Sequence, residues 1–274
     1  MNAPWWFGRV LWAFVRRELS AVGGYRAAFF VRMLGVATAV GSMLFLSRFV
    51  SAAVNPHLAE YNGNYLGFMV LGLLAAEFQQ VGVSGLAQRI RMAQMMGTLE
   101  AEIATPAPPW MVLGAPPVYE FGVAALRSAA YLTAAALLLG LDLNRANWLS
   151  LAVAVPLVIA AFSGLGLLAA GTTMLVRKLN PVATVIGSLS FFLSGVLYPM
   201  SVLPAWLRAV GQLLPLTHAL AALRGALLVG AGPGALAHSF VALALFAGVL
   251  APVGVGVFAF ALRRARADGS LSHY

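Results

Sequence analysis

Long runs of apolar residues, separated by short polar stretches, dominate the chain. Crossing the roughly 30 Å hydrocarbon layer of a bilayer takes about 20 mostly apolar residues in a helix. We predict that six runs form membrane-spanning helices, at residues 27–49, 65–86, 118–141, 148–176, 182–198 and 236–262. Because alanine, glycine and leucine dominate these runs without strand-like alternation, the pattern predicts an all-α membrane protein that forms a single transmembrane domain.

The stretch at residues 199–229 is also apolar, but it does not fit a spanning helix. Pro199, Pro204 and Pro215 divide it into short pieces, each able to begin a new helix. Its last apolar piece carries Arg224 and is too short to cross the bilayer. We therefore predict a re-entrant or interfacial segment on the outer face.

Residues 1–25 have the pattern of an amphipathic helix that lies in the membrane interface. On a helical wheel, apolar side chains share one side, while Arg9 and Arg16 share the other. Trp5, Trp6 and Trp12 suit the depth of the lipid headgroups.

Charge is scarce and predominantly basic. Charged residues make up 9% of the chain, against about a quarter in soluble domains, and the net charge is +9. The basic residues are spread between apolar runs, which argues against nucleic-acid binding. If the N-terminus is cytoplasmic, eleven basic residues fall on the inside, four on the outside and two within spans. Because cytoplasmic loops are rich in basic residues, both termini are predicted to be cytoplasmic.

The chain lacks the residues for several kinds of chemistry. Its single lysine, Lys178, is flanked by Arg177 and Leu179, so the chain has no P-loop for a nucleotide. It has no cysteine, and His57, His218, His238 and His273 lie far apart in the sequence. We predict no metal site and no catalytic residues in this chain.

Two ionisable residues lie deep within predicted spans. Glu77 and Arg127 are each nine residues from the inner end of their helix, hence about 13 Å deep on antiparallel neighbours. A charge at the bilayer centre costs at least about 2.5–3.5 kcal/mol, which favours a partner. We predict an ion pair with a structural role; a proton-relay role for Glu77 is the alternative.

The connection at residues 88–117 separates the second and third predicted spans. Good helix formers fill residues 89–104, and prolines follow from Pro106. The pattern predicts a short cytoplasmic helix, which serves either as a docking element or simply as a solvated connection.

Two sequence blocks, one at residues 97–106 and one at residues 198–224, together resemble type-2 ABC transporter permeases, the membrane subunits of bacterial polysaccharide, lipid and drug exporters. Gly97-Thr98-Leu99-Glu100, followed by Thr105-Pro106, resembles the signature of the first cytoplasmic loop in that family. The second block resembles the re-entrant hairpin after the fifth helix, at Tyr198, Pro199, Pro204, Trp206, Pro215 and Arg224.

The resemblance implies a bacterial inner-membrane permease subunit that works as a homodimer with two cytoplasmic ABC ATPase subunits. Residues 89–105 would form the coupling helix that seats in a cleft of the ATPase, and the coupling residues would be those of the matched motif: Gly97, Thr98, Leu99, Glu100, Thr105 and Pro106. This chain would hold no cofactor, because ATP and Mg²⁺ would bind the partner. The exported substrate would be a lipid, a lipid-linked glycan or a hydrophobic drug. A gradient-driven secondary transporter and a non-transport membrane scaffold are the alternatives.

Two further expectations concern packing. Aromatic and methionine side chains on the first, second and fifth spans are candidates to line a substrate path: Phe29, Phe30, Met33, Met43, Phe45, Phe68, Met69, Phe78, Phe191, Phe192 and Tyr198. Small residues in the fourth span, Gly164, Gly166 and Ala170, would permit close packing of two copies.

Overall fold

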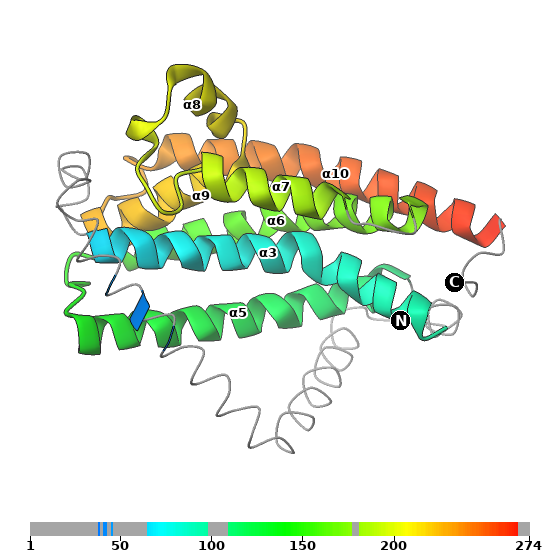
Figure 1. The fold of residues 1–274 in the computed structure, drawn as a ribbon, viewed down its shortest axis with the longest axis horizontal. Coiled ribbons are helices and arrows are strands. Elements are labelled where there is room, and N and C mark those ends of the chain that lie inside the picture. Colours follow the sequence, from blue (N-terminus) through cyan, green and yellow to red (C-terminus); the bar gives the residue numbers. More distant parts are fainter. Residues whose placement is uncertain are drawn as a thin grey trace, which may run out of the picture.

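The computed structural model describes residues 38, 41, 42, 45, 65–97, 109–176 and 181–267 (Figure 1). Every regular element in these ranges is helical, which confirms the predicted all-α fold class. The interfacial helix predicted at residues 1–25 lies outside the described residues. So does nearly all of the span predicted at residues 27–49.

Nine helical elements are arranged along the described chain. The long helices are α3 (Tyr65–Met95), α5 (Pro109–Leu139), α6 (Trp148–Val176) and α10 (Ala237–Ala267). The short ones are α7 (Pro181–Leu193), the 3-10 turn η2 (Met200–Val202), α8 (Ala205–Gln212), α9 (Pro215–Arg224) and the π-helical turn η3 (Gly225–Val229). Figure 1 shows the long helices and α7 running alongside one another, while α8 projects from the side of the bundle next to α7 and α9.

Four described helices are long and apolar enough to cross a membrane. They are Tyr65–Met95, Pro117–Leu138, Trp148–Val176 and Ala237–Arg264. The pair Ala205–Gln212 and Pro215–Val229, bent by 87°, forms a broken span or a re-entrant loop. The described part of the chain is therefore a multi-pass membrane bundle.

The fourth predicted span coincides with α6, and its start has a clear cause. The side-chain oxygen of Asn147 accepts a hydrogen bond of 3.0 Å from the backbone N–H of Ser150. A side chain of this type before the first helical residue satisfies a backbone donor that the helix itself leaves unpaired. The long apolar run then carries the helix through to Val176.

The connection after the second span differs from its predicted boundaries. The loop was predicted to begin at residue 88 with a separate helix from residue 89, whereas α3 continues without a break to Met95. No glycine or proline interrupts this stretch, so the helix has no reason to stop earlier. Gly97, at φ +68°, ends it, because glycine adopts this left-handed conformation without steric cost. The next helix, α5, already begins at Pro109, a residue type favoured at a first helical position.

The fifth predicted span is shorter than expected. It was predicted to run to residue 198, but α7 ends at Leu193, where Ser194 and Gly195 turn the chain. Gly195 has φ +76°, which breaks the helix. At about 1.5 Å per residue, α7 is about 20 Å long, less than the hydrocarbon thickness.

The small residues of α6 pack within the subunit. A Cβ atom at position 166 would overlap the carbonyl oxygen of Gly82 on α3, and one at position 164 would lie 2.8 Å from the Ala251 nitrogen on α10. Ala170 is fully buried. The expectation that this face packs against a second copy is therefore wrong, because α3 and α10 already occupy it.

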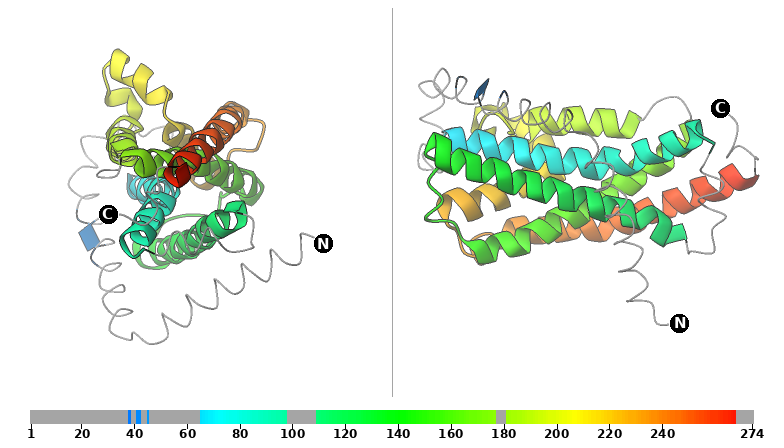
Figure 2. Two further views of the ribbon diagram at one scale, coloured as in Figure 1. Left: turned by 90° about the vertical axis from the view of Figure 1, so that its right-hand side faces the viewer. Right: turned by 90° about the horizontal axis from the view of Figure 1, so that it is seen from below.

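Chain direction alternates from helix to helix, so the bundle has two distinct ends. We call one the α9 end; there α3, α6 and α10 begin and α5 ends. The backbone N–H of Asn147, just before α6, donates to the Ala226 carbonyl of η3 over 2.8 Å. Leu141 packs with Val70 and Leu228 at the same end. The opposite end, which holds the end of α3, is called the Met95 end. Figure 2 shows α8 projecting to one side of the bundle.

Candidate functional site

Glu77 on α3 and Arg127 on α5 lie in contact. The Arg127 Nε atom is 2.9 Å from the Glu77 Oε1 atom. Beside this pair, Phe78 stacks on Phe121 of α5 with ring centroids 6.2 Å apart. The ion pair and the ring pair together tie α3 to α5. Glu77 and Arg127, the predicted partners, are thus in contact and connect two antiparallel helices.

Arg224, at the end of α9, is buried at 3% exposure. Its guanidinium group donates hydrogen bonds to three backbone carbonyls. Nε and Nη2 reach the Phe68 oxygen at 3.1 and 2.9 Å, Nη1 reaches the Gly195 oxygen at 2.9 Å, and Nη2 reaches the Val196 oxygen at 2.8 Å. The Cζ atom also lies 3.3 Å from the ring centroid of Phe68, a cation–π contact. One side chain therefore joins the start of α3, the turn after α7 and the end of α9.

The surroundings of Arg224 leave no room for a larger residue on α3. A Cβ atom at Gly72 would lie 2.7 Å from Arg224 Nη2 and would overlap the Val196 carbonyl oxygen. The Tyr65 hydroxyl donates a 3.0 Å hydrogen bond to the Leu197 carbonyl, which fastens the same turn to α3. We call these contacts the Arg224 junction. The sequence indicated that Arg224 belongs to the segment after the fifth span, but not that it is buried among backbone carbonyls.

The other residues predicted in this segment shape the chain after α7. The Tyr198 hydroxyl donates to the Phe192 carbonyl, which closes the turn. Pro199 and Pro204 precede η2 and α8, and Pro215 is the first residue of α9. Trp206 on α8 is 68% exposed. The prolines thus begin new helical pieces, as their spacing predicted.

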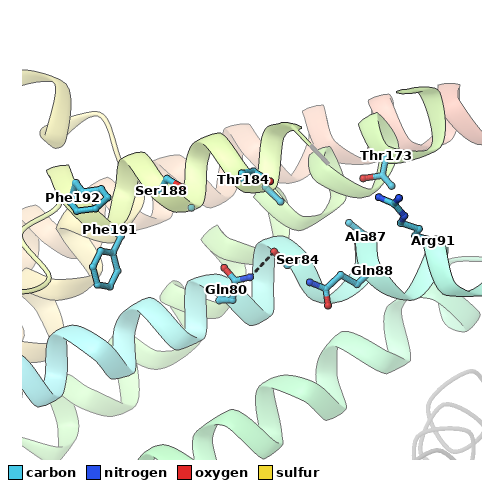
Figure 3. A pocket seen from close by; sticks show the side chains of 12 residues that line it. Gln80, Ser84, Ala87, Gln88, Arg91, Thr173, Thr184, Ser188, Phe191 and Phe192 are labelled. Atoms are coloured by element: carbon cyan, nitrogen blue, oxygen red, sulfur yellow. Dashed lines mark hydrogen bonds between the residues drawn. The ribbon is translucent and has the colours of Figure 1, made fainter. Parts of the chain in front are cut away.

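A polar groove of about 610 Å³ opens between α3 and α7 (Figure 3). Polar side chains line it from both helices: Gln80, Ser84, Gln88 and Arg91 on α3, and Thr184 and Ser188 on α7. Thr173 of α6 completes the polar lining near Arg91, and Phe191 and Phe192 line the other end. Gln80 Nε2 donates to Ser84 Oγ over 3.1 Å. The groove therefore offers amides and hydroxyls between the helices, with a guanidinium toward the Met95 end and aromatic rings toward the α9 end.

The sequence indicated only part of this groove. Of the aromatic residues named as candidates for a substrate path, Phe191 and Phe192 line this groove, whereas Phe68 lies beneath Arg224 and Phe78 packs on α5. Met69 is buried at 1% exposure. The polar lining was missed, although its spacing was visible: Gln80, Ser84 and Gln88 recur every four residues, which puts them on one helix face.

Of the predicted coupling residues, only Gly97 lies among the described ones. It forms the turn that ends α3, and its N–H donates to the Gln94 carbonyl over 3.1 Å. Three methionines before it, Met92, Met95 and Met96, are exposed at 53%, 62% and 67%. Thr98, Leu99, Glu100, Thr105 and Pro106 lie outside the described residues.

Two histidines that lie twenty residues apart in the sequence meet in the fold. The rings of His218 on α9 and His238 on α10 have centroids 5.9 Å apart, and His218 Nε2 lies 3.0 Å from the Gln212 carbonyl oxygen. Within the described ranges, histidine, aspartate and glutamate side chains form no group of three that could hold a metal ion.

Comparison with protein-family models shows which family the chain resembles. Residues 9–228 match the family described as ABC-2 type transporter. This range contains the ion pair, the polar groove, the Arg224 junction and the coupling residues at positions 97–106. No curated protein matches the chain significantly.

Proposed function

The chain belongs to the ABC-2 type transporter family, and on this premise we propose that it is the permease subunit of an ATP-driven exporter. The observation that carries the proposal is the continuous family match from residue 9 to residue 228, most of the chain's length. A permease subunit moves the substrate, while a separate ATPase subunit supplies the energy. This division of labour suits a chain without a Gly-Lys-Ser/Thr sequence for nucleotide phosphates.

Residues 97–106 are proposed as the contact with the ATPase. Gly97 turns the chain at the end of α3, and the exposed methionines Met92, Met95 and Met96 lie directly before it. Methionine is adaptable and common at protein-binding surfaces, so this end of α3 suits docking of a partner. Glu100 is proposed to contact a basic surface of the ATPase. Motion of the ATPase would then pass directly into α3, because the helix runs unbroken from Met95 into the bundle.

The polar groove is proposed as part of the substrate path. Its amides, hydroxyls and Arg91 suit the polar group of an amphiphile, while Phe191 and Phe192 suit an apolar or sugar-ring portion. The proposed substrate is therefore an amphiphilic molecule: a lipid, a lipid-linked glycan or a drug. Because α3 is both a wall of the groove and the element that leads to Gly97, movement of one helix would change the shape of the path.

The proposed assembly contains two copies of this chain and two ATPase subunits in a bacterial inner membrane. ATP and Mg²⁺ would bind the ATPase subunits. Each permease copy would have six spans, an interfacial N-terminal helix and cytoplasmic termini, and residues 199–229 would form the outer re-entrant segment. The 87° bend between α8 and α9, and the short α7 before it, support a re-entrant path for this segment.

Charge reversal at Glu100 tests the coupling role. In proteoliposomes that contain the chain and its ATPase, Glu100→Arg is expected to lower ATP hydrolysis by at least about tenfold, because like charges would face each other across the contact. Phosphate release measures the rate. Asp142→Asn, at the α9 end of the bundle, is the matched control and should leave the rate unchanged. If the complex with Glu100→Arg hydrolysed ATP at the normal rate, with both proteins present in equal amounts, Glu100 would not be part of the contact with the ATPase.

A further inference from the structure

A second groove, of about 780 Å³, lies on the other side of α3 from the polar groove. Residues from α3, α5, α6 and α10 line it, and nearly all are apolar, with Phe121, Ile159, Leu167 and Phe258 among the largest. On α3, the lining positions 82 and 86 lie roughly opposite positions 80 and 84 of the polar groove, because each residue advances the helix by about 100°. The two grooves therefore do not share an α3 face.

Small residues give this groove its depth. Its floor is the contact between Gly82 and Gly166, where the backbones of α3 and α6 approach too closely to admit a Cβ atom. On the α5 wall, a Cβ atom at Gly122 would meet nothing within 4 Å, so the space in front of it is open. The result is an apolar slot that runs between α5 and α10.

The rim at the Met95 end of this slot is predominantly basic. Arg263 and Arg264 follow the lining residue Leu262 on α10, and both are exposed. Arg89 lies one turn beyond the lining residue Leu86 on α3. Glu120 of α5 lies against Gly85 nearby. Three guanidinium groups and one carboxylate thus flank this end among the described side chains.

We propose that this groove binds an anionic phospholipid of the surrounding bilayer, with one acyl chain in the slot and the phosphate against the rim. An apolar slot beside guanidinium groups matches both halves of such a lipid: the chain is buried against carbon, and the phosphate accepts charge-assisted hydrogen bonds. Arg263 and Arg264 are the phosphate-binding residues, and Gly122 leaves the room that the acyl chain fills. The site is separate from the substrate path, and it does not depend on the transport function proposed above.

Native mass spectrometry of the detergent-purified full chain tests the proposal. The probes are dioleoyl-phosphatidylglycerol and dioleoyl-phosphatidylcholine, added in separate titrations. We expect phosphatidylglycerol to bind roughly 10- to 30-fold more tightly than phosphatidylcholine, since each basic residue near a lipid surface contributes a few-fold. The double variant Arg263→Gln with Arg264→Gln should remove this preference, while Arg145→Gln, at the opposite end of the bundle, should keep it.

A second variant tests the slot itself. Gly122→Trp should fill the groove and abolish tight binding of both lipids, because the ring would occupy the space of the acyl chain. Gly248→Trp is the matched control, since a Cβ atom at Gly248 also meets nothing within 4 Å and this residue does not line the groove. Equal binding of the two lipids, or unchanged lipid binding by Gly122→Trp, would overturn the proposal. So would a Gly122→Trp variant that no longer forms a dimer but still binds phosphatidylglycerol. The last result would mean that a second copy of the chain covers the groove.

Discussion

Replacing Arg224 by methionine is expected to destabilise the folded chain by roughly 3–5 kcal/mol. The guanidinium of Arg224 donates to the carbonyls of Phe68, Gly195 and Val196 in a buried position. Methionine fills part of the volume but donates no hydrogen bond, so the substitution removes these contacts and the cation–π contact with Phe68. The thermal midpoint of the detergent-solubilised chain should fall by about 10 °C or more, measured by the loss of the monodisperse peak in size-exclusion chromatography.

Arg208 supplies the matched control for this prediction. It also donates to two backbone carbonyls, those of Ser201 and Leu203, but it is exposed on α8. Because water can replace the lost bonds there, Arg208→Met should change stability by less than about 1 kcal/mol. The loss of stability caused by Arg224→Lys should lie between the losses caused by Arg224→Met and Arg208→Met, since an ammonium group cannot reproduce the planar guanidinium that reaches three carbonyls. Equal losses for Arg224→Met and Arg208→Met would show that the junction does not stabilise the fold.

The second large effect is expected at the crossing of α3 and α6. A Cβ atom at position 166 would overlap the carbonyl oxygen of Gly82, which belongs to the backbone and cannot rotate away. Gly166→Ala should therefore force the two helices apart and cost about 1–3 kcal/mol or more. The expected result is a lower thermal midpoint and a lower yield of monodisperse protein.

Gly248→Ala on α10 is the control for the crossing. Its added methyl group meets nothing within 4 Å, so the folded state is not strained. Alanine also favours the helix over glycine, and stability should be unchanged or slightly higher. If Gly166→Ala were as stable as Gly248→Ala, the close contact between α3 and α6 would not exist in the folded protein.

Sequence reasoning was most successful where the pattern lies within one element, or where the distance of a residue from the end of its helix can be counted. The fourth span coincides with α6, because a long apolar run follows an asparagine that caps the helix. The pairing of Glu77 with Arg127 followed from equal depths on antiparallel neighbours, and the two side chains lie 2.9 Å apart. Both inferences used only residue types and a fixed rise per residue.

Other features depend on contacts that leave no such signature. The partners of Arg224 are backbone carbonyls, which every residue type possesses, and Phe68 lies 156 residues away in the chain. The polar groove depends on how α7 faces α3, and periodicity within either helix does not fix that pairing. Likewise, the small residues of α6 indicated close packing, but only the fold shows that α3 and α10 are the partners.

The two grooves on opposite sides of α3 give this helix a central place in the proposed transporter. One side carries amides, hydroxyls and Arg91, and the other carries glycine and leucine against α5 and α6. The exposed methionines and Gly97 complete its Met95 end. A helix that contacts the ATPase, the substrate path and the lipid-binding slot would link all three of these proposed sites.

Co-purification of the chain with an ATPase subunit tests most directly the central claim that the chain is the permease of an ATP-driven transporter. When the chain is purified from its native host through an affinity tag on its C-terminus, it should retain a P-loop ATPase in a complex with two copies of each protein, measured by native mass spectrometry. The complex should hydrolyse ATP in proteoliposomes, and Glu100→Arg should suppress this hydrolysis. A well-folded chain that purifies without any ATPase, and that adds nothing to the ATPase's own hydrolysis when mixed with it, would contradict the account.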